Sequence, residues 1–236
     1  MQRARFVLVG ASLLAALLLL ASGPGTRAGI WEWQSGFMLL RWALYIGFAT
    51  AALALVMLII PKTRGAQPTI LVAALLMGVM AGAPAVSLRT QAGSLPPIHD
   101  ITTDVRDPPA FIALLAARKA SPNGADYGGP EIAAQQAKAY PNVRPMLLPL
   151  PPQEAFTRAA DVARASGWEI VSADAATGRI EATATTLWFG FRDDIIVRIA
   201  PRGAASRIDV RSVSRVGMSD IGANARRIQE YLSKLT

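Results

Sequence analysis

RIEATATTLWFGFRDDIIVRIAPRGAASRIDVRSVSR, residues 179–215, is the stretch that decides the fold of the C-terminal part of this chain. Apolar and polar residues alternate along much of it, which is typical of strands with one buried and one polar face. We predict strands over residues 179–188, 194–200 and 206–215, and a further strand over 168–172 just upstream. Because consecutive strands joined by short turns pair antiparallel, these segments predict a four-stranded antiparallel sheet.

Helical patterns stand before and after this strand-rich stretch. Residues 153–166 place Phe156, Ala160 and Ala163 on one helical face, and Gly167 ends that segment. A second helix is predicted to begin at Ser219, as its N-cap, and to run to the C-terminus with a regular apolar stripe. Two packed helices on the apolar sheet face make residues 98–236 a soluble α+β domain, a two-layer sandwich. A polar linker at 91–97 precedes it.

Residues 1–90 are predicted to be a membrane anchor with three transmembrane helices, at about 6–22, 37–60 and 69–88. The first segment has an alternative as a secretory signal peptide, because basic residues precede it and small residues follow it. Arg3 and Arg5 lie before the first segment, and Lys62 and Arg64 lie between the second and the third. The positive-inside rule therefore places the N-terminus inside and the C-terminal domain outside.

Gly78 and Gly82 form a G-x-x-x-G pair in the third apolar segment. Such a pair lets another helix backbone approach closely. We expect it to pack against the other two segments of the same chain, with a homo-oligomer through Gly78 and Gly82 as the alternative. Neither acidic residues nor the histidine lie inside the three segments, so an ion path through the anchor is not expected.

Composition excludes several function classes. The chain has no cysteine, which excludes disulfides, thiolate catalysis and cysteine-ligated metals. Its net charge of +8 lies mostly in residues 1–97, which hold seven basic residues and one acid, whereas residues 98–236 hold seventeen and fifteen. This distribution serves membrane topology, and no nucleic-acid binding is expected. No phosphate-binding glycine loop, catalytic triad or H-E-x-x-H motif appears, and no cofactor is expected.

The polar face of the predicted sheet is the best candidate for ligand binding. Its arginines and threonines are suited to bidentate recognition of phosphate, carboxylate or a lipid headgroup, with an aromatic turn beside them. The candidate residues are Arg179, Arg198, Arg207, Arg211, Arg215, Thr183, Thr185 and Trp188. The alternative is a solvated face on which Glu181, Asp194 and Asp209 pair with these arginines across strands. Trp188 itself fits either the core or a membrane or ligand contact.

Two further groups of titratable residues stand out in the sequence. His99, the only histidine, stands with Asp100 and Asp104 and forms a weak candidate metal or acid–base site; a structural His99 is the alternative. Asp193 and Asp194 are adjacent on a predicted strand and therefore point to opposite faces, so we expect them to pair with Arg192, Arg211 or Arg215.

Several blocks resemble one known family. GWEIVSADAATGRIEATATTLWFGFRDDIIVRI and SRIDVRSVSRVGMSDIGANARRI, with the earlier IHDITTD, DPPAF and AYP, closely resemble the domain of unknown function 1499 family over about residues 97–235. Members are bacterial and plastid proteins, some of them membrane-attached, with no established activity, cofactor or catalytic residues. The resemblance and the charge pattern together predict a bacterial inner-membrane protein with a cytoplasmic N-terminus and a periplasmic domain.

Three functions remain open from the sequence. The leading hypothesis is a non-enzymatic module that binds a partner protein or an anionic envelope component. The alternatives are a metal-assisted hydrolase or lyase that uses the His99 region, and an assembly scaffold.

Overall fold

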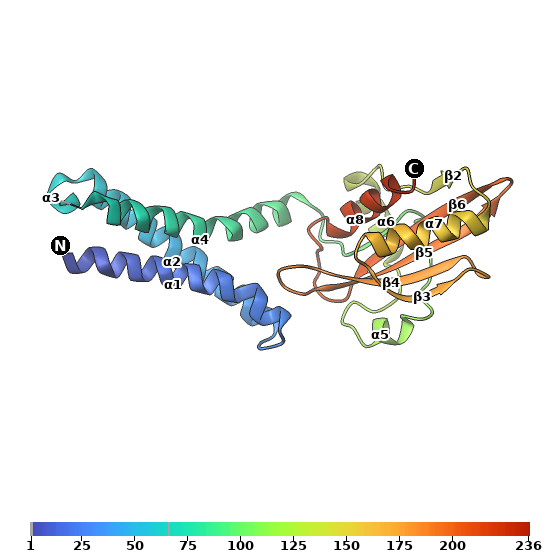
Figure 1. Ribbon diagram of the computed structural model, residues 1–236, viewed down its shortest axis with the longest axis horizontal. Helices are drawn as coiled ribbons and strands as arrows, with labels where there is room; N and C mark the ends of the chain where they lie inside the picture. Colours follow the sequence, from blue (N-terminus) through green and yellow to red (C-terminus); the bar gives the residue numbers. More distant parts are fainter. Residues whose placement is uncertain (1, 66) are drawn as a thin grey trace. The chain divides into compact units, whose positions relative to one another are not determined.

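The computed structural model describes residues 2–65 and 67–236 (Figure 1). Contacts within the chain divide it into two compact units. The first comprises Met1–Gln91 with Leu187–Gly190, and the second comprises Ala92–Thr186 with Phe191–Thr236.

The first unit contains three long helices: α1 (Gln2–Arg27), α2 (Trp33–Ile59) and α4 (Pro68–Ser94), with the short α3 (Pro61–Arg64) between the last two. Within the described residues, all three are long and apolar enough to cross a membrane. Each is longer than its predicted span, and α4 continues for ten residues beyond Pro84 into the expected linker. The chain between the anchor and β1 is correspondingly short.

Small and hydroxylated residues join the three long helices. The Ser12 hydroxyl donates to the Ala74 carbonyl at 3.0 Å and lies 3.3 Å from the Thr50 hydroxyl, so it links α1 to α2 and α4. Gly47 of α2 faces Gly78 of α4, and a Cβ added to either glycine would collide with the backbone of the other helix. The face of α4 that carries Gly78 and Gly82 therefore packs against α2 of the same chain, one of the two segments that the prediction named.

The second unit is built on a six-stranded antiparallel sheet. Its strands are β1 (Asp100–Thr102), β2 (Met146–Leu148), β3 (Glu169–Asp174), β4 (Arg179–Thr185), β5 (Arg192–Arg202) and β6 (Ala205–Ser214). The order is β1-β6-β5-β4-β3, and β2 also pairs with β6. The prediction of four strands was wrong because β1 and β2 have three residues each, too few to show a period of two.

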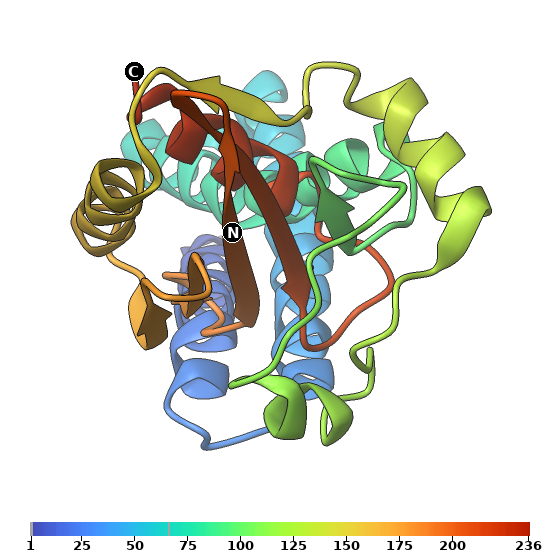
Figure 2. The ribbon, with the colours of Figure 1, turned by 90° about the vertical axis from the view of Figure 1, so that its right-hand side faces the viewer.

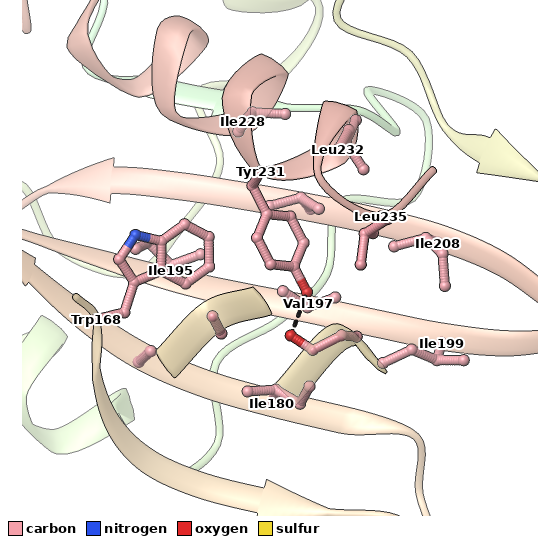
Figure 3. Packing of buried hydrophobic residues seen from close by; sticks show 14 of the residues in the cluster. Trp168, Ile180, Ile195, Val197, Ile199, Ile208, Ile228, Tyr231, Leu232 and Leu235 are labelled. Atoms are coloured by element: carbon pink, nitrogen blue, oxygen red, sulfur yellow. Dashed lines mark hydrogen bonds between the residues drawn. The ribbon is translucent and has the colours of Figure 1, made fainter. Parts of the chain in front are cut away.

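Helices α7 (Pro152–Ala165) and α8 (Ala223–Ser233) cover the apolar face of the sheet. Their apolar residues meet the inward side chains of β4, β5 and β6 in one core (Figure 3). Tyr231 of α8 is buried there, stacks on Trp168 at 4.7 Å between ring centroids, and donates its hydroxyl proton to the Ala159 carbonyl of α7 at 2.9 Å. Burial raises the pKa of Tyr231, so the hydroxyl stays protonated as a donor.

The final helix begins later than predicted. Ser219 accepts a hydrogen bond from the Ile221 N–H, but α8 starts only at Ala223. Ile221 and Gly222 have positive φ angles of 51° and 73°, which interrupt a helix started at Ser219. The Asp220 carboxylate instead accepts from the N–H groups of Gly222 and Asn224.

The polar face of the sheet is covered as well, so the domain is not a two-layer sandwich. Residues 103–128, including α5 (Leu115–Lys119), cross this face, and Figure 2 shows α5 on the side of the sheet opposite α7 and α8. Phe111 and Leu114 of this cover segment pack against Ile196 and Val213 of the sheet. Beyond it, α6 (Gly129–Ala139) supplies Gln136, whose amide bonds both the N–H and the carbonyl of Thr102 and so occupies the outer edge of β1.

Candidate functional site

The predicted ligand surface on the sheet is largely buried by the cover segment, residues 103–128. Strand register places Arg179 beside Arg198, Glu181 beside Ile196, and Thr183 beside Asp194 on this face. Thr183 is 4 % exposed and Arg211 is 3 % exposed. These two residues are therefore buried and not open to a ligand, and the contacts favour the alternative in which Glu181, Asp194 and Asp209 pair with the arginines, on a face that is covered where these two residues lie.

Glu181 is used to hold the cover segment in place. Its fully buried carboxylate accepts hydrogen bonds from the backbone N–H groups of Ile112, Ala113 and Leu114, at 2.8, 3.1 and 2.8 Å. These N–H groups stand just before α5 and have no carbonyl partner within that helix. A negative charge at such a position is stabilised by the same donors, so Glu181 anchors α5 to β4.

Arg211 is saturated by partners from the N-terminal half of the domain. It forms a bidentate ion pair with Asp100, at 3.0 and 2.7 Å, and donates to the carbonyls of Pro109 and Ala125. The rings of Phe111 and Tyr127 lie against its guanidinium. Burial first, and the Asp100 charge second, raise the pKa of Tyr127 to about 12. These contacts leave Arg211 no exposed donor with which to bind a ligand.

A second buried charge group surrounds Asp194. Arg215 forms a bidentate pair with it, Arg118 of α5 lies 3.4 Å away, and the Thr183 hydroxyl donates to it at 2.9 Å. Asp193 points to the opposite face and pairs with Arg227 of α8 at 2.6 Å. The prediction that the adjacent aspartates point apart is confirmed, as is the Asp194–Arg215 pair, but the Arg227 partner was missed.

Two accessible arginines of the polar face have their charges compensated by carboxylates. Arg198 and Arg207, with side chains 26 % and 41 % exposed, bind Asp104, Asp107 and Asp209. Three carboxylates therefore surround two guanidinium groups. An anionic ligand gains little attraction here, because the arginines already have their counter-charges.

The structure separates the three candidate metal ligands. Asp100 pairs with Arg211, Asp104 pairs with Arg198 and Arg207, and the His99 ring lies 3.4 Å from the Met218 carbonyl. Among the residues that the structure describes, no group of three or more His, Cys, Asp or Glu residues could hold a metal ion. The arrangement gives a metal-assisted reaction at His99 no support.

The two other predicted residues lie elsewhere. Trp188 is 40 % exposed and belongs to the first unit, between the ends of β4 and β5. Thr185, the last residue of β4, is exposed and lines a cavity between β4, the end of α7 and the outer face of α8.

This cavity, which we call the α8 cavity, has a volume of about 310 Å³. The charged residues in its lining are Arg226, Arg227, Glu230 and Lys234, so three cations stand against one carboxylate. Ser166 and Trp168 line it from the end of α7 and the start of β3. It is a cationic hollow of the described domain in which polar groups converge from several elements.

In the sequence, Arg226 and Arg227 lie off the apolar stripe of the last helix, which is typical of a solvated helix face. One signal was available: Arg226, Glu230 and Lys234 repeat at a spacing of four, which places them in one row along a helix. Nothing in the sequence indicates that Ser166 and Trp168 lie opposite that row, because this contact depends on how α7 and α8 pack on the sheet.

Asp220 lies near the same end of α8. Burial raises its pKa above the ordinary value of 3.8, although the N–H groups of Asn224 and Gly222 oppose the shift. The nearby Asp193 charge acts in the same direction as burial, and Arg227 against it. Asp220 serves mainly to start α8.

No curated protein matches the chain. A solved structure, the crystal structure of TTHA0849 from Thermus thermophilus, is 14 % identical, covers 39 % of this chain and 88 % of its own, and aligns with a TM-score of 0.23. A family model described as "Protein of unknown function (DUF1499)" matches residues 100–235. This match spans the α+β domain and more than half of the chain, and the protein therefore belongs to the DUF1499 family of unknown function.

Proposed function

We propose that this protein is a non-enzymatic binding module, anchored in a bacterial inner membrane, whose periplasmic α+β domain binds an anionic envelope component or an acidic group of a partner protein. The observation that supports this function best is the excess of cations around the α8 cavity. The arginines of the sheet face are neutralised by their own carboxylates, whereas Arg226 and Lys234 make no ion pair within the described residues. The binding surface that we propose therefore lies on the helix layer, at the α8 cavity, and not on the polar face of the sheet that the sequence favoured.

The test compares native mass spectra of the full-length protein, extracted gently in detergent. We expect the wild type to carry a co-purifying anionic mass and the double variant Arg226→Glu, Lys234→Glu to lose it, because the variant reverses two cations of the cavity. The control Lys119→Glu, Lys138→Glu changes the same total charge on α5 and α6 and should retain the mass.

A bare monomer in the wild-type spectrum would contradict the proposal. A bare homo-oligomer would favour an assembly scaffold instead. Retention of the mass by the Arg226, Lys234 variant would place the binding surface elsewhere. The hydrolase or lyase alternative has no observation in its favour, since Asp100 and Asp104 are bound to different arginines.

A further inference from the structure

We propose, as an extension of the function proposed above, that the α8 cavity is a site for a phosphate group, whose oxygens accept hydrogen bonds from Trp168, Lys234 and Arg226. One unpartnered donor, two cations that retain free donors, and the size and polarity of the cavity support this assignment.

Trp168 supplies the observation that points to a ligand. The residue is 8 % exposed, no hydrogen bond among the described residues involves its indole N–H, and the nitrogen is not among the side-chain atoms sealed from solvent without a partner, so it is open to the cavity. Figure 3 shows the indole nitrogen on the edge of the ring that faces away from Tyr231. An indole N–H is a donor only, and a nearly buried one normally has an acceptor. Because Trp168 lines the cavity, an acceptor bound there would satisfy it.

Two cations of the cavity retain free donors. Lys234 donates to the Ser166 hydroxyl at 3.3 Å and Arg226 donates to the Ile221 carbonyl at 3.1 Å, which occupies one N–H of each. The two residues are eight positions apart along the end of the chain, so they stand about two helical turns from each other. Eight residues rise about 12 Å along a helix, so the two cations reach one phosphate by extending toward it from their present partners, the Ile221 carbonyl and the Ser166 hydroxyl.

The other charged groups of the lining limit the ligand to a small anion. Arg227 is held by Asp193 at 2.6 Å and by the side chains of Ser212 and Asn224, so it acts as a fixed part of the wall. Glu230 stands between Arg226 and Lys234 on the same helical row and disfavours polyanions. A phosphate with one or two negative charges fits the remaining positive charge.

The size of the cavity agrees with this ligand class. A volume of about 310 Å³ lies at the lower end of the range for small-molecule sites and exceeds what a bare phosphate needs. Its walls are mainly polar, so they suit a phosphate that carries a small polar group and do not suit an acyl chain. Such a group occurs both in free phosphorylated metabolites and in phospholipid headgroups.

The test is calorimetric titration of inorganic phosphate into full-length protein in nanodiscs of neutral lipid, at constant ionic strength. We expect saturable binding to one site per chain. Lys234→Gln and Trp168→Phe should each weaken it about tenfold, because each removes one donor to an anion. Trp168→Phe keeps a ring against Tyr231, so an unchanged melting temperature reports that the fold is intact. The control Lys138→Gln should bind as the wild type does.

Phosphatidylglycerol added to the nanodiscs separates the two sources of phosphate. If it raises the apparent Kd of the wild type for inorganic phosphate, the ligand is a headgroup; if it does not, the ligand is a free phosphorylated molecule, and both results support the site. Absence of saturable binding, or equal binding by wild type and Trp168→Phe, would overturn it. If phosphate fails while charge reversal at Arg226 and Lys234 still removes the co-purifying mass, only the phosphate assignment is lost.

Discussion

At the scale of single residues, one carboxylate fastens the cover segment to the sheet. Glu181→Gln keeps the shape of the side chain but replaces an acceptor oxygen by an NH₂ group that faces backbone N–H donors. We expect a loss of about 2 kcal/mol in the free energy of unfolding, the typical cost of leaving a buried charged-group hydrogen bond unmade. Guanidinium titration of the full-length protein in detergent measures it.

Glu154→Gln is the matched control for this change. Glu154 lies exposed in the first turn of α7, and we expect its substitution to change the free energy of unfolding by less than about 0.5 kcal/mol. Equal stability of Glu181→Gln and Glu154→Gln would mean that the cover segment is held by its apolar contacts at Phe111 and Leu114 alone.

At the scale of elements, close packing of α2 on α4 depends on two glycines. Gly78→Leu places a side chain where the backbone of Gly47 already lies, so α2 and α4 must separate. We expect the melting temperature of the detergent-solubilised protein to fall by on the order of 5 °C, as overpacking of about 1–3 kcal/mol implies for a chain of this size. Size-exclusion of heated samples measures it.

Gly10→Leu provides the comparison within the anchor. Apart from its own helix backbone, no atom lies within 4 Å of a Cβ built at Gly10, so the added side chain starts in open space. Its melting temperature should stay close to that of the wild type. A fall equal to that of Gly78→Leu would show that added bulk anywhere in the anchor is destabilising, and that the Gly47–Gly78 contact has no special role.

At the scale of the whole molecule, the distribution of basic residues predicts the orientation in the membrane. The cysteine-free chain allows single thiols to report it. We expect Lys138→Cys, on exposed α6, to react with a membrane-impermeant maleimide in intact spheroplasts, and Lys62→Cys, between α2 and α4, to react only after permeabilisation. The opposite labelling pattern would place the domain in the cytoplasm.

Periodicity in the sequence is sufficient to predict the three apolar helices, the strands β3 to β6 and the helices α7 and α8. Each of these elements is long enough to repeat its pattern of apolar residues. It also shows that Asp193 and Asp194 point to opposite faces, since side chains alternate along any strand. Periodicity does not show β1 and β2, which are too short for a pattern, or the start of α8, which follows the positive φ angles of Ile221 and Gly222.

Alternation of polar and apolar residues does not show whether a polar face meets water or protein. Alternation marks Arg179, Thr183 and Arg211 as polar-face residues, but it contains no information about the irregular segment, distant in the chain, that covers them. The α8 cavity likewise requires residues from α7, β3, β4 and α8 to come together. Local pattern therefore established the elements and their polar and apolar faces, and long-range packing alone decided which charged groups are neutralised inside the domain and which stay available to a ligand.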